Sequence, residues 1–139
     1  MKLDDVRALW AVRRHAADDV AKQVAQADAR RADAERALAT FRAHVGDEVQ
    51  RAQGLGLSPP LALWYGAAAT RLHDLETVAV ERAGQAAAAR GALRDAMTEA
   101  ERIGTVSEQL ETQRRARIAR HAQDRTDELG LRRQPRRPR

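Results

Sequence analysis

Histidine, serine and acidic side chains are the groups in this sequence that could do chemistry. The four histidines have no metal-binding neighbours at helical spacing, and even a catalytic zinc site needs three protein ligands; they are His15, His44, His73 and His121. Ser58 and Ser107 have no nearby base in the sequence to activate them as nucleophiles. The pattern also lacks a glycine-rich phosphate loop and predicts no cavity for a small-molecule ligand. We therefore expect no catalytic site, no metal and no cofactor, and a protein that is not an enzyme.

One short turn organises the rest of the chain, at residues 54–60. Gly54 and Gly56 can end a helix by adopting the left-handed conformation. Ser58 can cap the next helix, and Pro59 suits the first helical position because its missing N–H has no partner to lose there. The turn thus predicts one helix over residues 3–53 and a second over residues 59–129, folded back on the first.

Apolar residues before the turn recur at alternating steps of three and four, the 3.5-residue period of a helix wound around a partner. In an antiparallel hairpin, the numbers of facing residues have a constant sum. A sum of 113 pairs most of the large apolar residues, including Leu3 with Leu110, Trp10 with Ile103, Val20 with Leu93, Leu38 with Leu75, Phe41 with Leu72, Val45 with Ala68 and Val49 with Trp64. The predicted fold is all-α, an antiparallel two-helix coiled-coil hairpin.

Arginines interrupt this apolar seam at three positions, Arg13, Arg31 and Arg82. Their long stems can cover the seam while the guanidinium groups reach water or acids such as Glu35. Alternatively, Arg31 and Arg82 form a polar layer that fixes the register at some cost in stability. Both interpretations stay open at this point.

The second predicted helix is longer than the first. With Leu3 opposite Leu110, residues 112–129 extend beyond the start of the first helix and have no internal partner. Beyond Ile103 we expect the seam to change phase to Val106 and Leu110, with a bend at Gly104. The domain organisation is therefore a helical hairpin over residues 1–129 and a disordered arginine-rich tail over residues 130–139.

Composition favours an elongated helical protein over a globular one, because alanine dominates the 43% of apolar residues and only four residues are aromatic. The net charge of +5 belongs to the tail: its ten residues hold five arginines, which leaves 20 basic and 20 acidic residues in the body. Cysteine is absent, and no apolar run reaches the roughly 18 residues that span a bilayer. The N-terminus lacks the apolar core of a signal peptide. We expect a soluble cytoplasmic protein.

Three segments carry a resemblance to a known family: the basic-apolar start at 6–14, the mid-chain turn followed by Leu63-Trp64-Tyr65, and the ending from Gln113-Arg114-Arg115-Ala116-Arg117 to Asp127-Glu128-Leu129. Over nearly its whole length the chain resembles the FliJ family of flagellar export proteins and, more distantly, the YscO-type stalk proteins of type III secretion. The resemblance implies an antiparallel two-helix stalk that sits in a hexameric export ATPase, connects it to the membrane export gate and escorts export chaperones. It also implies a cytoplasmic location, peripherally associated with the inner membrane.

The resemblance assigns each end of the hairpin a partner. The terminal end would enter the ATPase ring through Leu3, Val6, Arg7, Leu110, Arg114, Arg117, Ile118 and His121. The half nearer the turn would face the export-gate membrane protein through Phe41, Val45, Val49, Trp64 and Leu72. At positions 45 and 49 this chain has valine where the family often carries larger aromatic residues.

Two other classes of function stay open. A generic coiled-coil adaptor or scaffold would show the same periodicity. Nucleic-acid binding would use the tail and the arginines of 114–120, but the neutral body lacks the basic stripe that such a coil carries. Binding to a membrane surface through the seam is disfavoured, because the seam is narrow and matched by the partner helix.

Overall fold

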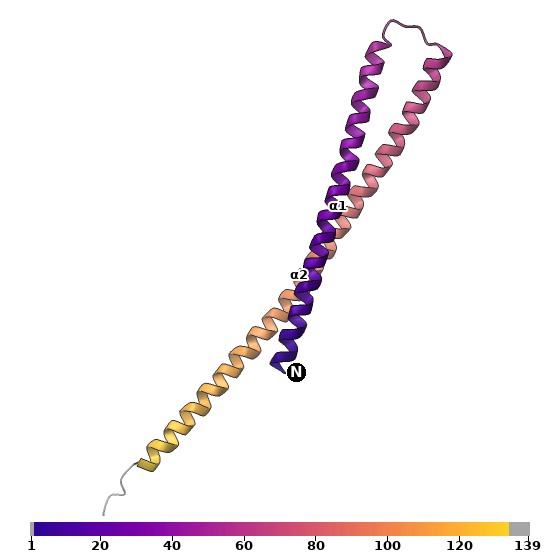
Figure 1. Cartoon of the computed structure of the whole chain (residues 1–139). Coiled ribbons are helices and arrows are strands. Elements are labelled where there is room, and N and C mark those ends of the chain that lie inside the picture. Colours follow the sequence, from indigo (N-terminus) through magenta and orange to yellow (C-terminus); the bar gives the residue numbers. More distant parts are fainter. Residues whose placement is uncertain (1, 134–139) are drawn as a thin grey trace, which may run out of the picture. The chain divides into compact units, whose positions relative to one another are not determined.

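The computed structural model describes residues 2–133, which form two helices joined by a turn (Figure 1). Helix α1 spans Leu3–Arg51 and helix α2 spans Pro59–Arg133. The two helices pack against each other, so the predicted all-α hairpin is confirmed. The contacts group the chain into two compact units. Of the described residues, unit 1 holds 2–15 and 97–133, and unit 2 holds 16–96.

The turn forms as the sequence predicts, with one exception. Gly54 has a φ of 86° and, among the described residues, is alone in having a positive φ, so the prediction for Gly56 is wrong. The Leu61 N–H donates to Ser58 Oγ at 3.4 Å and the Ala62 N–H donates to the Ser58 carbonyl at 2.9 Å. Ser58 is therefore the N-cap of α2, and Pro59 is its first residue.

The 3.5-residue period sets which side chains are covered in each unit. The predicted seam positions of α1 are residues 3, 6, 10, 13, 17, 20, 24, 27, 31, 34, 38, 41, 45 and 48. Thirteen of these fourteen are buried or half-buried, and Arg13 is the exception. The facing positions of α2 from Tyr65 to Leu110 follow the same alternation, and none is exposed. Most of the buried apolar residues are small: Val6 and Ala100 in unit 1, and Ala17, Leu38, Ala68 and Ala86 in unit 2. Small residues at the contact let two helix axes approach closely.

Three ion pairs between the helices give an independent measure of the register. Arg42 contacts Glu76 at 2.9 Å and Arg90 contacts Asp28 at 2.6 Å in unit 2, and Arg7 contacts Glu111 at 3.3 Å in unit 1. In each pair the two residue numbers sum to 118, whereas the facing residues of the seam sum to 113. All three pairs therefore flank the seam at equivalent heptad positions. Exposed ion pairs contribute only about 0–1 kcal/mol each. Their main effect is on register.

The seam arginines behave as the first interpretation expects. Arg31 and Arg82 are half-buried, and each donates a hydrogen bond along its own helix, Arg31 to Glu35 at 2.8 Å and Arg82 to Gln85 at 3.0 Å. Arg13 is exposed, so its place in the seam was predicted wrongly. A long charged side chain keeps its hydration by leaving the apolar interface.

The predicted change of phase near Gly104 is also wrong. Ser107 is buried, with 8% of its surface exposed, whereas Val106 is exposed. The seam therefore continues through Ile103, Ser107 and Leu110, and α2 runs unbroken through Gly104. A Cβ on Gly104 would lie 3.0 Å from Nε1 of Trp10. The glycine thus makes room for the indole ring.

Helix α2 continues four residues beyond its predicted end, through residues 130–133. A glycine inside a helix costs about 1 kcal/mol relative to alanine but does not forbid the helix. Arg132 and Arg133 then lie in the last turn, where positive charge is favourable. The rest of the predicted disordered tail, 134–139, lies outside the described residues.

Enlarging Ala86 tests the tight seam. The side chain is fully buried, whereas that of its neighbour Ala87 is exposed. Ala86→Phe should lower the free energy of unfolding by about 1–3 kcal/mol, because a packed interface cannot absorb a ring without strain. Ala87→Phe should cost less than about 1 kcal/mol, as expected from helix propensity alone. Urea melts of both variants measure the difference, and equal losses would contradict the packing described here.

Candidate functional site at the terminal end

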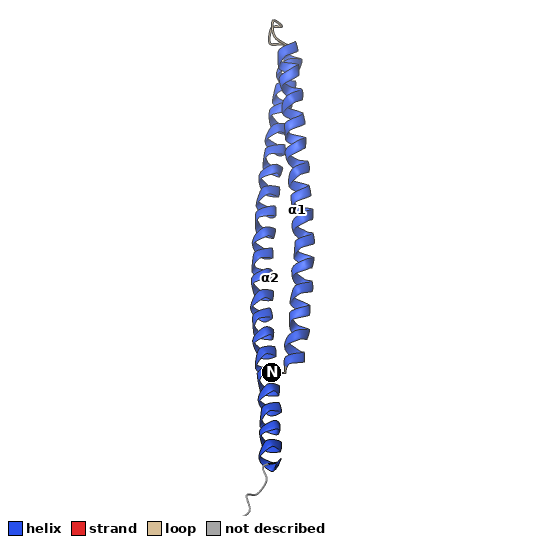
Figure 2. Cartoon of the chain, turned by 90° about the vertical axis from the view of Figure 1, so that its left-hand side faces the viewer, coloured by secondary structure: helices blue, strands red, loops and turns tan. Residues whose placement is uncertain are grey.

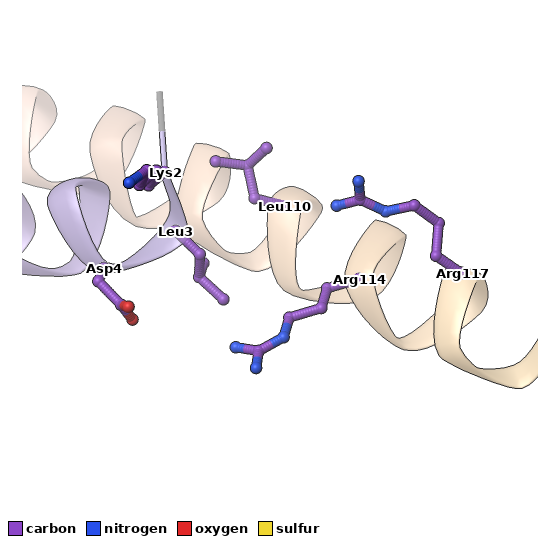
Figure 3. A pocket seen from close by; sticks show the side chains of 6 residues that line it. All are labelled: Lys2, Leu3, Asp4, Leu110, Arg114 and Arg117. Atoms are coloured by element: carbon purple, nitrogen blue, oxygen red, sulfur yellow. The ribbon is translucent and has the colours of Figure 1, made fainter. Parts of the chain in front are cut away.

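The helix ends in unit 1 form an open groove that combines apolar and charged side chains (Figure 3). Leu3 at the start of α1 and Leu110 on α2 supply its apolar surface. The groove is lined by Lys2, Leu3, Asp4, Leu110, Arg114 and Arg117. The guanidinium groups of both arginines reach back toward the two leucines in Figure 3. An acidic side chain next to an apolar one would fit such a groove.

Beyond this groove, α2 has no covering partner among the described residues. Every residue from 112 to 133 is exposed, and in unit 1 this part of α2 continues past the start of α1 (Figure 2). A second depression lies along it, lined by Leu110, Gln113, Ala116, Arg117 and Arg120. Ile118 is exposed on the same segment. The terminal end therefore offers a continuous mixed surface, which we call the α2 extension (residues 112–133).

Charge is unevenly distributed along the α2 extension. Residues 114–120 hold four arginines and no acid, whereas 124–128 hold three acids and one arginine. Arg115 pairs with Glu111 at 2.6 Å. Arg114, Arg117 and Arg120 make no ion pair with any described residue. These three arginines leave positive charge that an acidic partner could neutralise.

Glu111 links the two helices at the inner edge of this surface. It pairs with Arg115 on its own helix and with Arg7 of α1. The hydrogen bond from Arg115, and then that from Arg7, hold the pKa of the Glu111 carboxyl below its ordinary value of 4.5. Because these bonds favour the charged form, the carboxylate stays ionised as the pH falls toward its ordinary pKa. It anchors the start of α1 to α2.

The structure brings together four of the residues predicted for the ATPase end. Leu3, Leu110, Arg114 and Arg117 line the groove, while Ile118 and His121 lie exposed on the extension. Val6 is only 2% exposed, so it belongs to the core and cannot contact a partner directly. Arg7 lies beside the groove in its ion pair. Sequence reasoning missed Lys2, Asp4 and Glu111; the seam sum of 113 places Arg7 opposite Val106, so it gave no signal for the ion pair of Arg7 with Glu111.

The residues predicted for the gate end divide into groove, seam and surface positions. Phe41 and Trp64 line an open groove in unit 2 together with His44, Ala67, Ala68 and Arg71. Val45 and Leu72 are half-buried seam residues, and Val49 is exposed. The ring of Phe41 lies 6.3 Å from that of His44, and Trp64 meets Tyr65 edge to face at 5.2 Å. The alternation of the seam gave no signal for His44 or Arg71, which flank it.

No protein family, curated protein or solved structure matches this chain. Across residues 2–133, no three His, Asp or Glu side chains lie close enough to hold a metal ion. Neither helix, in its described part, contains a segment apolar enough to cross a membrane.

Acid titration tests the role of Glu111. A carboxyl whose pKa is lowered by folding adds stability above its ordinary pKa, and that stability is lost as the pH falls through the folded-state value. Glu111→Gln should therefore melt below the wild type at pH 7, and the difference should shrink steadily once the pH drops below 4.5.

Glu108→Gln is the matched control, because Glu108 lies one turn away, is exposed and makes no ion pair with the described residues. Its melting temperature should follow the wild type at each pH. If the melting temperature of Glu111→Gln lies below that of the wild type by the same amount at pH 7 and at acid pH, the ion pairs assigned to Glu111 would be contradicted.

Proposed function

We propose that this protein is the central stalk of a type III protein export apparatus, of the flagellar kind. In this proposal the terminal end of the hairpin inserts into the hexameric export ATPase. The observation that carries the proposal is the α2 extension, an exposed helical segment next to a groove in which Leu3 and Leu110 lie beside two arginines without ion-pair partners. The resemblance of the sequence to FliJ proteins supports the same assignment.

The chemistry of the terminal end suits the mouth of a protein ring. Arg114, Arg117 and Arg120 can form charge-assisted hydrogen bonds with carboxylates of a partner, and Ile118 offers an apolar contact. Long-range attraction between this basic segment and an acidic ring would also speed encounter, more strongly at low salt. The chain does no chemistry of its own in this role; it transmits contacts.

The other end of the hairpin is proposed to face the export gate. The groove lined by Phe41, His44 and Trp64 gives unit 2 an apolar surface with a basic residue, Arg71, at its edge. A gate protein or an export chaperone that offers an amphipathic helix would fit this groove. The two ends would then connect the ATPase with the membrane-embedded export machinery.

Charge reversal at the groove tests the ATPase contact. Arg114→Glu combined with Arg117→Glu should weaken binding to the hexameric export ATPase from the same genome by about tenfold or more, because two charge-assisted contacts become repulsive. Arg30→Glu combined with Arg36→Glu makes the same charge change on exposed residues of unit 2 and should leave the affinity unchanged. Titration calorimetry with purified proteins measures both, and circular dichroism checks that each variant is folded.

The partner that the wild-type chain binds separates the stalk proposal from the two alternative functions. A chain that fails to bind the ATPase but captures another protein would be an adaptor coil instead. Affinity for DNA that falls steeply with salt would indicate nucleic-acid binding. Either outcome would overturn the stalk proposal.

A further inference from the structure

The turn end of unit 2 holds the longest uncharged stretch of the chain. Residues 52–70 contain no acidic or basic side chain, in a protein in which 32% of residues are charged. Arg51 and Arg71 bound the stretch. Three leucines within it are unusually exposed: Leu55 at 69%, Leu57 at 76% and Leu63 at 77%. So much exposed leucine surface on one turn calls for an apolar environment.

The helix ends at this turn pair their backbone N–H groups internally, whereas no described residue accepts a backbone hydrogen bond from Gly56, Leu57 or Ser58 in the loop. Pro59 and Pro60 have no N–H, and the next two N–H groups of α2, those of Leu61 and Ala62, both bond to Ser58. At the end of α1, the carbonyls of Glu48 and Gln50 accept from Ala52 and Gln53, and the Leu55 N–H donates to the Ala52 carbonyl. An apolar medium penalises every unpaired backbone group. The first turn of α2 leaves no donor to penalise.

Two aromatic residues lie just behind the leucines. Trp64 and Tyr65 contact each other edge to face, and each combines an apolar ring with a polar N–H or O–H. Such residues gather at membrane–water interfaces. Trp64 lies five residues from the start of α2, or roughly 7.5 Å along the helix axis. That distance falls within the 5–10 Å to which interfacial segments enter a bilayer.

We propose that the turn end of unit 2 inserts Leu55 and Leu57 of the turn and Leu63 of α2 into the interfacial layer of a lipid bilayer, with Trp64 and Tyr65 at the headgroup level. The turn closes the end of the hairpin, and neither helix continues past it (Figure 1). A fluid bilayer fits such a convex apolar tip, whereas a protein partner would normally meet a polar rim, which the uncharged stretch lacks. This insertion is shallow and spans nothing, and it does not require the stalk function.

Flotation of the full chain with vesicles of zwitterionic phosphatidylcholine tests the proposal. The wild type should float with the vesicles. Its binding should be nearly unchanged between about 0.1 M and about 0.5 M salt, because no charge attraction is involved. Replacing Leu55, Leu57 and Leu63 by serine should lower the partition coefficient by about tenfold or more. The control variant carries serine in place of Leu129 and Leu131, which are 59% and 70% exposed on the α2 extension. It should float like the wild type.

Tryptophan fluorescence locates the inserted segment. The chain has two tryptophans, so Trp10→Phe leaves Trp64 as the reporter. Its emission should shift to the blue on vesicles and be quenched by lipids brominated near the headgroup, and circular dichroism verifies that the variant is folded.

Three outcomes would overturn the proposal. The wild type could fail to float; it could float only with anionic lipids and detach in salt, which would assign binding to the arginines; or the serine variant could float equally well. Loss of self-association in the serine variant, without vesicle binding by the wild type, would make a second copy the occupant instead. Vesicle binding uses no export protein, so this test and that of the stalk proposal can fail independently.

Discussion

The alternation of covered positions every three and four residues is the constraint on which this protein depends. Two helices alone bury little surface, so each layer of the seam must be occupied by a residue that fits closely. Alanine fills four of the six buried apolar positions, which allows a close approach of the helices. A one-residue shift of register would expose these alanines and place the flanking arginines and acids in the contact. The same shift would also break the three ion pairs between the helices, which share one residue-number sum.

Both surfaces proposed to bind partners arise where this constraint ends. Past Leu110 the positions that would continue the seam are Arg114, Arg117, His121, Asp124 and Glu128, so α2 stops offering an apolar stripe to α1 and becomes exposed. At the opposite end of the seam, the turn is uncharged and its leucines have no facing helix. One end is thus suited to an acidic protein and the other to an apolar environment.

Much of this fold could be predicted from residue spacing alone, because heptad periodicity, Gly54 and the Ser58-Pro59 pair act locally. The errors came from effects that spacing does not contain. Gly104 suggested a change of phase in the seam, but its missing side chain makes room for Trp10 on the other helix. Arg13 kept the period yet left the seam for water. At the candidate site, Leu3, Leu110 and the two arginines could be placed by register, whereas Lys2, Asp4 and Glu111 emerged only from the packing of side chains around the helix ends.

Cysteine cross-linking tests the fold-back register most directly, because the chain has no cysteine of its own. Val6 and Ser107 are both buried and their numbers sum to 113, so Val6→Cys with Ser107→Cys should oxidise to an internal disulfide in a monomer. Val6→Cys with Ala100→Cys uses an equally buried position that lies seven residues, about 10 Å, nearer the start of α2 than Ser107, too far for a disulfide. The register of 113 predicts a cross-linked monomer for the first pair and free thiols for the second. Cross-linked dimers, or a disulfide in the second pair instead of the first, would contradict it.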